Sequence, residues 1–369
     1  MNMRFLMNSM LMLVLALSDG VSMVSCVAED SPARQNDTAR QYAPEVYAYL
    51  NTANEREALD EEAMLVYRDT LWRYEEKNKK VRLPKHFRTS LGELTATPIN
   101  DHPLPEPDFV PSRKGLDVLS ISGSGRFSLK ELEVLTDTIN QLAGDRPKVI
   151  IDLRGECHGF VNGSHMSLYG LNNWSNIGRQ RAQIMAAEEE IFAGIKGTTI
   201  TAYTISSDNA YEPVEPVEVM VAAEGTCTEK QAVEQAGWQY RRVTALDHAF
   251  PCDETIDQFL DVYRSLPENA WLHFHCHKGN GRTTTYMSFY DMLRNPDVPL
   301  KDILYRQAKL GGGNLYYSGD GPDELPWRIP LYIETSWLIP LLYDYVQDNR
   351  ANSYQVSWTD WKRKVFRLF

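Results

Sequence analysis

Short apolar runs alternate with amphipathic stretches from residue 111 onward. Three runs are compact and apolar, as in buried strands: 118–121, 149–153 and 271–274. Three stretches have apolar residues at the spacing of a helix: 128–142, the stretch that begins at Asp253, and 282–293. Ser128 and Glu131 have the spacing of a capping box that opens the first of these helices. The alternation predicts an α/β domain, with a twisted sheet flanked by helices.

Other segments depart from this rhythm. Residues 54–78 are charged, with apolar positions that predict a helix. Prolines crowd residues 98–111, which predicts an extended segment across the surface. Residues 198–223 contain β-branched runs interrupted by Pro213 and Pro216, which predicts a small β insertion. The organisation we expect is a polar and helical extension over 29–83, followed by a main domain over 84–369 that includes the insertion.

The N-terminal residues are typical of an export signal. Arg4 precedes an apolar stretch over residues 5–17, too short to span a bilayer. We interpret residues 1–28 as a signal peptide cleaved after Ala28, which predicts a secreted or periplasmic protein. Cleavage before Cys26 would instead give a lipid-anchored protein, the weaker alternative. No other apolar run approaches the length of about 18 residues that a membrane span needs.

Composition and charge narrow the class of ligand. The 369 residues are 43% hydrophobic, enough for a sizeable core, and carry 50 acidic against 38 basic side chains. The net charge of −12 has the wrong sign for a protein that coats nucleic acid. An anionic ligand therefore requires a locally basic pocket. Five cysteines are too few for a disulfide scaffold, so each is considered singly, and the oligomeric state is left open.

Residues 275–283, HCHKGNGRT, follow an apolar strand and open a helix. Backbone N–H groups and the helix N-terminus converge in such a loop, while Gly279 and Gly281 permit close approach of an anion. Arg282 can hold two phosphate oxygens, and the positive field favours the nucleophilic thiolate form of Cys276. The loop thus predicts both a phosphate cradle, to which Asn280 also belongs, and a nucleophile.

This nonapeptide resembles the active-site signature of the cysteine-based protein-tyrosine-phosphatase superfamily. Further segments resemble the bacterial phosphatase-like inositol polyphosphatases, the cysteine phytases: 87–90, 110–117, 151–160, 271–276 and 300–307. The resemblance runs from about residue 84 to the end of the chain. It implies a protein-tyrosine-phosphatase-like core with a small partial β-barrel, hydrolysis of inositol polyphosphates such as phytate, and no nucleic-acid partner.

A phosphomonoesterase also needs a proton donor for the leaving oxygen. Asp247 stands 29 residues before Cys276, in a segment similar to the family's general-acid loop. We expect Cys276 to attack phosphorus while Asp247 protonates the leaving group, after which Asp247 activates water. Thr283 is expected to hydrogen-bond the sulfur. Neither step calls for a metal or another cofactor, and the alternating His273, His275 and His277 are not interpreted as ligands.

The resemblance also nominates substrate-binding residues outside the nucleophile: Arg88, Asp152, His248 and Lys278, with Arg113 and Lys114 as weaker candidates. His277 and Lys278 replace an acidic and a small residue of the family loop, which we expect to add positive charge beside the bound phosphate. Residues 316–328 differ from the family in having less positive charge. Asp320, Asp323 and Glu324 stand there among residues that include lysines in relatives, which leaves Arg328 as the cation. A less phosphorylated inositol is therefore a possible substrate.

Two alternatives for function stay open at this point. One is a phosphotyrosine or phosphoinositide phosphatase, and the other is a non-catalytic phosphate-binding module. Intact Cys276, Arg282 and Asp247 argue against the second. Cys157 and Cys252 lie beside two of the predicted site segments, where they form either a disulfide or two buried thiols.

Overall fold

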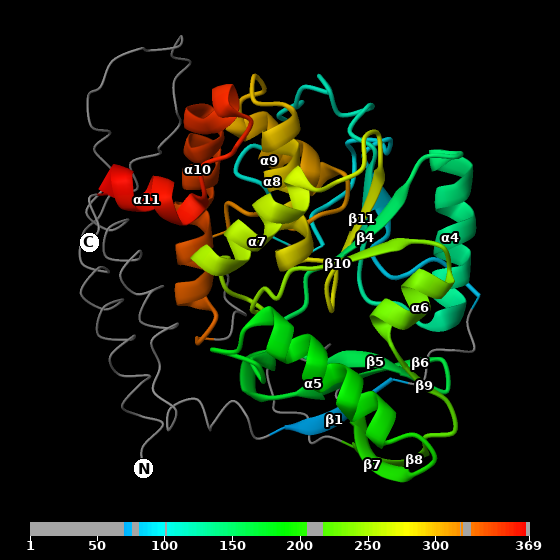
Figure 1. Ribbon diagram of the computed structural model, residues 1–369. Helices are drawn as coiled ribbons and strands as arrows, with labels where there is room; N and C mark the ends of the chain where they lie inside the picture. The colour runs from blue at the N-terminus through cyan, green and yellow to red at the C-terminus, as the bar shows by residue number, and fades with distance from the viewer. Residues whose placement is uncertain are drawn as a thin grey trace.

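A five-stranded sheet forms the centre of the main domain (Figure 1). The computed structural model describes residues 70–75, 81–99, 102–204, 217–317, 319 and 326–366. The sheet has the order β10-β4-β11-β3-β2, and its strands are β2 (Arg88–Thr89), β3 (Ile121–Ser124), β4 (Lys148–Asp152), β10 (Gln239–Arg242) and β11 (Trp271–His275). All neighbouring strands run parallel except β2, which pairs antiparallel with β3. The mixed α/β architecture is as the sequence predicts.

The four parallel strands end in register. His275 lies opposite both Asp152 and Ser124, and Arg242 lies opposite Asp152. The carboxyl ends of the strands therefore share one edge, where α/β proteins commonly bind ligands. The predicted strand at 118–121 begins three residues later than expected. Ser120 adopts a positive φ of 57° and Val118 is 78% exposed, so residues 118–120 belong to the preceding turn.

A second, six-stranded sheet lies at the lower end of the molecule in Figure 1. Its order is β8-β7-β1-β6-β5-β9, and its strands are β1 (Leu71–Tyr74), β5 (His158–Val161), β6 (Ser164–Tyr169), β7 (Thr199–Thr204), β8 (Val217–Ala222) and β9 (Thr226–Thr228). Strands β7 and β8 confirm that the predicted insertion is β structure. The partial barrel is not confirmed, because the pairings recorded for the described residues leave β8 and β9 at opposite ends of the sheet.

The predicted helix over 54–78 is wrong at its C-terminal end. Leu71–Tyr74 forms strand β1, which pairs antiparallel with β6 and parallel with β7. Its apolar residues Trp72 and Tyr74 pack on the core of the second sheet, so tertiary pairing overrides the local pattern. The signal peptide and the rest of the 29–69 segment lie outside the described residues, as do Pro213, Pro216 and the acidic residues 320–324.

Helices cover both faces of the central sheet (Figure 1). The α-helices are α4 (Leu129–Ala143), α5 (Arg181–Gly194), α6 (Glu229–Gln235), α7 (Asp253–Arg264), α8 (Gly281–Arg294), α9 (Leu300–Lys309), α10 (Ile329–Asn349) and α11 (Trp358–Phe366), and the 3₁₀ helices are η1 (Leu171–Asn173) and η2 (Arg350–Asn352). The capping box before α4 is confirmed: Glu131 N–H donates to the Ser128 hydroxyl, and Ser128 N–H donates to the Glu131 carboxylate.

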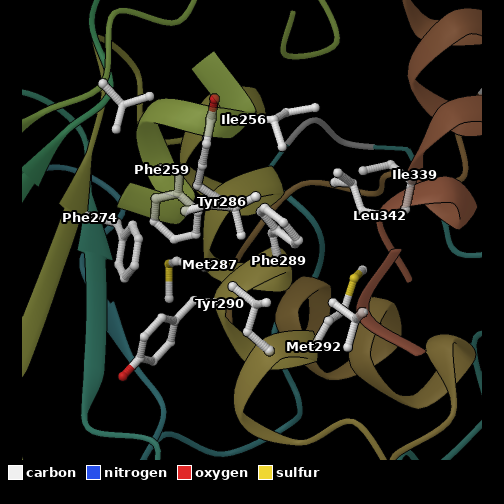
Figure 2. Packing of buried hydrophobic residues seen from close by; sticks show 14 of the residues in the cluster. Ile256, Phe259, Phe274, Tyr286, Met287, Phe289, Tyr290, Met292, Ile339 and Leu342 are labelled. Carbon is white, nitrogen blue, oxygen red and sulfur yellow. The ribbon is translucent and has the colours of Figure 1, made fainter. Parts of the chain in front are cut away.

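Figure 2 shows the larger core, on the face of the sheet covered by α7, α8 and α10. Phe274 of β11 meets Phe259 of α7 and Met287 of α8 there, and Leu342 of α10 closes the far side. This packing holds α8 rigidly against β11, so the loop that joins them has two fixed ends. On the opposite face, α4 and α6 cover a smaller core around the buried residues Ile150 and Trp271.

The proline-rich segment follows the expected extended course where it is described. Residues 102–110 contain neither helix nor strand, and Leu104 anchors them against Tyr305 and Ala308 of α9. Within the described part of the chain, no helix combines the length and apolar character needed to cross a membrane.

Candidate active site

The loop between β11 and α8 wraps around the Cys276 sulfur. Cys276 is 2% exposed, and the N–H of Gly279 donates to its Sγ at 3.2 Å. Gly279 adopts φ = +84°, and a Cβ there would overlap the backbone of Ser124 and Gly125. Only glycine suits this position. At Gly281 a Cβ would meet open space, so that glycine has no such steric requirement.

Arg88 braces the loop from behind. Its guanidinium donates to the Gly279 carbonyl at 2.9 Å and to the Thr284 hydroxyl at 3.2 Å, and the residue is 5% exposed. Burial lowers the pKa of Arg88 to about 10, and the nearby Cys276 acts in the opposite direction. Arg88 remains charged at neutral pH and adds to the field on the sulfur. Its direct contact with substrate stays a prediction.

Arg282 is held in place by a carboxylate that the sequence analysis missed. Its Nη1 donates to Glu156 Oε2 at 2.9 Å and also reaches the carbonyls of Leu153 and Ala245. Glu156 is 1% exposed, and burial would raise its pKa, but Arg282 and Arg154 hold that pKa well below its usual value. Glu156 lies in the 151–160 segment that carries the family resemblance, which was the available signal.

Asp247 meets the same guanidinium from the other side. Its Oδ2 lies 2.8 Å from Arg282 Nη2 and accepts a hydrogen bond from Asn173 Nδ2 at 2.9 Å. Trp174 Nε1 donates to the Asp247 carbonyl at 2.7 Å and fixes the loop. Burial opposes ionisation of Asp247, but Arg282 and His248 outweigh it and lower the pKa of this carboxyl. Asn173 and Trp174 had no signal in the sequence pattern.

His248 stands at the rim of this group. Its Nε2 is 4.0 Å from Asp247 Oδ2, and its ring makes an edge contact with Trp327 at 5.1 Å between centroids. Burial lowers the pKa of His248 to about 4, against the attraction of Asp247, so the imidazole is neutral at pH 7. The side chain can therefore offer a substrate hydrogen bonds rather than a charge.

The two residues after Cys276 differ in their surroundings. Lys278 is exposed, as a residue that meets a soluble anion would be, whereas His277 is buried. Arg73 Nη2 lies 2.8 Å from His277 Nδ1, and the His277 carbonyl accepts hydrogen bonds from Arg126. Burial, followed by Arg126 and Arg73, lowers the pKa of His277 well below its usual value. The positive charge expected from His277 is therefore wrong, and Arg73 of β1 supplies charge there instead.

Thr283, Asn280 and Asp152 are also predicted site residues. Thr283 is 0% exposed in the first turn of α8, and its hydroxyl has no hydrogen-bond partner among the described residues, which suits the predicted role at the sulfur. Asn280 precedes α8 and accepts from Thr284 through its carbonyl. Asp152, also 0% exposed, sits in a buried polar network with Tyr240 and Arg242, so its substrate contact stays a prediction.

Three further predictions concern residues outside the loop. Arg113 pairs with Asp117 and donates to the Gly92 carbonyl, so its guanidinium is engaged by its own neighbourhood. Lys114 donates its backbone N–H to the Ser112 hydroxyl. Cys157 and Cys252 are thiols rather than a disulfide, and Asn176 Nδ2 lies 3.3 Å from the Cys157 sulfur.

A family model and solved structures match this chain. The model of the PTP-like phytase family matches residues 151–294, and its description reads "Inositol hexakisphosphate". The PTP-like myo-inositol phosphatase of Mitsuokella multacida, solved with myo-inositol-(1,3,4,5)-tetrakisphosphate, is 34% identical with a TM-score of 0.73, covering 89% of this chain and 58% of that one. A PTP-like phytase from Bdellovibrio bacteriovorus is 25% identical with a TM-score of 0.59, covering 79% and 94% of the two chains.

A curated relative has a different description. Effector protein hopD2 of Pseudomonas syringae pv. tomato is 29% identical over 288 residues, which are 78% of this chain and 59% of that protein. The present chain thus spans about three fifths of the length of this relative and of the Mitsuokella chain.

The fold and the loop together define the class of protein. A sheet with parallel strands at its centre carries Cys276 and Arg282 at the two ends of the loop between β11 and α8, and the Asp247 carboxylate on a separate loop pairs with Arg282. This arrangement is similar to that of protein-tyrosine-phosphatase-like proteins. Within this class, residues 151–294 match the PTP-like phytase model, and the chain is similar to solved PTP-like phytases.

Proposed function

We propose that this protein hydrolyses phosphate monoesters of inositol polyphosphates through a phosphocysteine intermediate. The observation that carries the proposal is the convergence of three groups on one loop. The Gly279 N–H bonds the Cys276 sulfur, and Arg282 lies 2.8 Å from the carboxylate of Asp247. A nucleophile, an anion-binding guanidinium and an acid–base carboxylate are the components that phosphoryl transfer through cysteine needs.

In the first step the Cys276 thiolate attacks phosphorus, and an S–P bond forms while the P–O ester bond breaks. The leaving alkoxide takes a proton from Asp247, so an alcohol departs. Backbone N–H groups of residues 277–282 and the Arg282 guanidinium stabilise the charge on the equatorial phosphate oxygens. Glu156 keeps Arg282 in position from behind, at 2.9 Å.

In the second step water attacks the phosphocysteine. Asp247 accepts a proton from that water, the S–P bond breaks, and Cys276 returns to the thiolate as phosphate leaves. The Thr283 hydroxyl, which has no other partner among the described residues, is available to donate to the departing sulfur. The enzyme is thereby regenerated with Asp247 protonated for the next cycle.

The bound phosphate also prepares Asp247 for its role as an acid. In the described structure Arg282 Nη2 is engaged by Asp247, and this contact lowers the pKa of the carboxyl. A phosphate dianion on Arg282 competes for the same donor and places negative charge beside Asp247. Both effects raise the carboxyl pKa, because they remove a favourable neighbour and add an unfavourable one. Substrate binding therefore favours the protonated form that the first step uses.

The choice of inositol polyphosphates rests on the relatives and on charge. The Mitsuokella relative was solved with an inositol tetrakisphosphate, and the matching family is described by the hexakisphosphate. On this chain, exposed Lys278 lies in the loop, and Arg328 lies beside Trp327 near His248. These cations can meet phosphates that are not being transferred. The acidic 320–324 segment favours a substrate with fewer than six phosphates.

Phosphate release tests the proposal directly. The purified chain is incubated with myo-inositol hexakisphosphate, an inositol tetrakisphosphate, a phosphotyrosine peptide and phosphoinositide vesicles. We expect turnover of the inositol phosphates, and loss of turnover with retained phosphate binding in Cys276→Ser. Cys227→Ser is the matched control, because Cys227 is a half-buried thiol on β9.

Each result has a defined meaning. Preference for the peptide or the vesicles would keep the mechanism and overturn the substrate. Full activity of Cys276→Ser would overturn the mechanism. Phosphate binding without turnover of any substrate by the unmutated protein would favour a non-catalytic binding module.

We further propose that the protein is exported to the periplasm or the medium. The support is the sequence of residues 1–28, with Arg4 ahead of an apolar stretch and Ala28 at a small-residue cleavage site. Mass spectrometry of the mature N-terminus tests this. A chain that begins at Glu29 supports export, a lipid-modified Cys26 indicates anchoring, and retention of Met1 in the cell overturns the proposal.

A further inference from the structure

Behind the catalytic loop, three buried side chains from three elements point at one spot. They are Asp152 at the end of β4, His158 at the start of β5 and Glu229 at the start of α6, and each is 0% exposed. His158 Nε2 lies 3.1 Å from Asp152 Oδ2 and 3.2 Å from Glu229 Oε2. All three ligand atoms lie within 4.8 Å of one another. One nitrogen and two carboxylate oxygens therefore share a small volume without access to water.

The hydrogen bond on the other ring nitrogen decides what His158 Nε2 can do. Nδ1 lies 2.9 Å from the carbonyl oxygen of Glu156, and a carbonyl can only accept, so Nδ1 carries a proton. A metal ion between the two carboxylates would take the lone pair of an unprotonated Nε2. Neither Nε2 nor either oxygen of Glu229 has a hydrogen-bond partner of acceptable geometry among the described residues. Buried polar atoms without partners are costly, so this arrangement calls for a cation between them.

The charges around the spot point the same way. Three buried carboxylates gather there, those of Asp152, Glu188 and Glu229, and Arg242 contributes one guanidinium, 3.0 Å from Asp152. Acidic side chains therefore outnumber basic ones among these four residues. The imidazoles of His158 and His275 face these carboxylates, with Nε2 to oxygen distances from 2.6 to 3.8 Å. A divalent cation would reduce the repulsion among the carboxylates and engage His158 Nε2 and an oxygen of Glu229, which are both without a hydrogen-bond partner among the described residues.

We propose that Asp152, His158 and Glu229 bind a divalent metal ion, Zn²⁺ or Mn²⁺, which ties β4, β5 and α6 together behind the catalytic loop. Ligand atoms about 2.0–2.2 Å from such an ion lie about 3.3 Å apart in a tetrahedral arrangement. The separations of 3.1 and 3.2 Å match that spacing. Imidazole with carboxylates suits zinc and manganese better than calcium or copper(I).

The surroundings of the three ligands are those of a supported metal site. His158 donates through Nδ1 to a backbone carbonyl, the common outer contact of a metal-binding histidine. Asp152 accepts from the Tyr240 hydroxyl, from Arg242 and, through Oδ1, from the Arg154 N–H. His275 Nε2 lies 2.6 Å from Glu229 Oε1 and 3.8 Å from Asp152 Oδ1. His275 precedes Cys276, so the ion would stabilise the start of the loop between β11 and α8.

Metal analysis of the purified chain tests the site without reference to phosphatase activity. The chain is expressed in medium supplemented with zinc or manganese, then assayed by inductively coupled plasma mass spectrometry. We expect about one ion per chain, and a lower unfolding temperature after removal of the ion with a chelator, because a buried ion binds only the folded state. A chain that carries no stoichiometric metal from either medium, and whose unfolding temperature is the same with and without added Zn²⁺, Mn²⁺ or chelator, would overturn the proposal.

Two variants locate the ion. Glu229→Gln and His158→Gln keep the approximate size of each side chain and should lower metal affinity by at least about tenfold. Glu188→Gln is the matched control: it removes a buried carboxylate from the same network but outside the three ligands, and should retain the ion. Metal retained in Glu229→Gln, or lost equally in Glu188→Gln, contradicts the assignment. If a variant does not fold, the metal content and chelator response of the unmutated chain still decide the question.

Discussion

The two sheets of this protein contribute to the site in different ways. The central sheet is parallel across β10, β4, β11 and β3, and every residue of β11 is buried. The second sheet is largely antiparallel, and Val217 and Met220 on its β8 strand are 61% and 63% exposed. Parallel strands need cover on both faces, whereas an antiparallel sheet tolerates one solvated face. The central sheet therefore provides the rigid support for the nucleophile.

The second sheet reaches the site through individual side chains. Arg73 of β1 contacts His277 in the catalytic loop, and His158 of β5 contacts Asp152 at the end of β4. These contacts lie at the junction of the two sheets, where side chains are buried even though β8 is exposed. The central sheet therefore positions the proposed nucleophile, while the second sheet adjusts the charge around it.

The strongest test of this division concerns Asp247, the proposed general acid, which pairs with Arg282 of the loop between β11 and α8. Asp247→Asn should lower kcat/KM toward an inositol phosphate by about 10²–10⁴-fold, because a general acid contributes that much. The measurement is phosphate release under steady-state conditions. Asp261→Asn, an exposed aspartate side chain on α7, is the control and should leave the rate unchanged. A loss below tenfold in Asp247→Asn would assign the proton transfer to another group.

The same variant has a predicted pH signature in stability. The folded-state pKa of Asp247 is lowered, so the stability that its pairing with Arg282 contributes is present above the usual carboxyl pKa of about 3.9 and is lost as pH falls through the folded pKa. The difference in unfolding temperature between the wild type and Asp247→Asn should be largest near neutrality and shrink below about pH 4. A difference that grows in acid would contradict the ion pair.

The next largest difference between the two sheets is expected in how much their buried side chains contribute to the free energy of unfolding. Phe274→Ala removes a fully buried ring from β11 and should destabilise the protein by about 3–5 kcal/mol. Denaturant unfolding measures this loss. The comparator is Val221→Ala in β8, which removes a smaller side chain at the rim of the second core and should cost less. Equal losses would mean that the second sheet supports the fold as strongly as the central sheet does.

A smaller effect on activity is expected from Arg73. Arg73→Gln removes the guanidinium beside His277, and because Arg73 acts through a residue of the loop, kcat/KM should fall by about 10–100-fold. The pH profile should also move, since burial and Arg126 lower the pKa of His277 and Arg73 lowers it further. Arg241→Gln, a partly exposed arginine on β10, is the control. An unchanged pH profile of kcat/KM would mean that Arg73 supports the fold without influencing the charge of His277.

The smallest effect belongs to the exposed face of the second sheet. Met220→Ser on β8 should change the free energy of unfolding by no more than about 0.5 kcal/mol, because the side chain is mostly solvated. Thermal unfolding and phosphate release together check this. A loss of several kcal/mol would show that this face is covered in the intact protein, and would weaken the contrast between the two sheets.

Parts of the fold followed directly from local pattern. The capping box of Ser128 and Glu131, the helix from Asp253 and the strand at β11 lie where the sequence predicts them. Strand β1 was not predicted, because the local spacing of apolar residues suggested a helix. Its partners β6 and β7 lie about a hundred residues away or more along the chain. The predicted start of β3 at residue 118 was wrong because Ser120 adopts a positive φ. The spacing of apolar residues does not reveal such a backbone angle.

The nucleophile, the glycine and the arginine of the proposed phosphate loop were predictable from local sequence. Cys276, Gly279 and Arg282 lie within seven residues, and a strand–loop–helix brings them together. The partners of these residues come from distant parts of the chain and depend on the folded arrangement. Glu156 is 126 residues from Arg282, and Arg73 is 204 residues from His277. Tertiary structure also decided charge: burial beside arginines makes His277 neutral, whereas the sequence suggested a cation. The physical reason is that pKa depends on desolvation and on neighbouring charges, and the folded chain alone sets both.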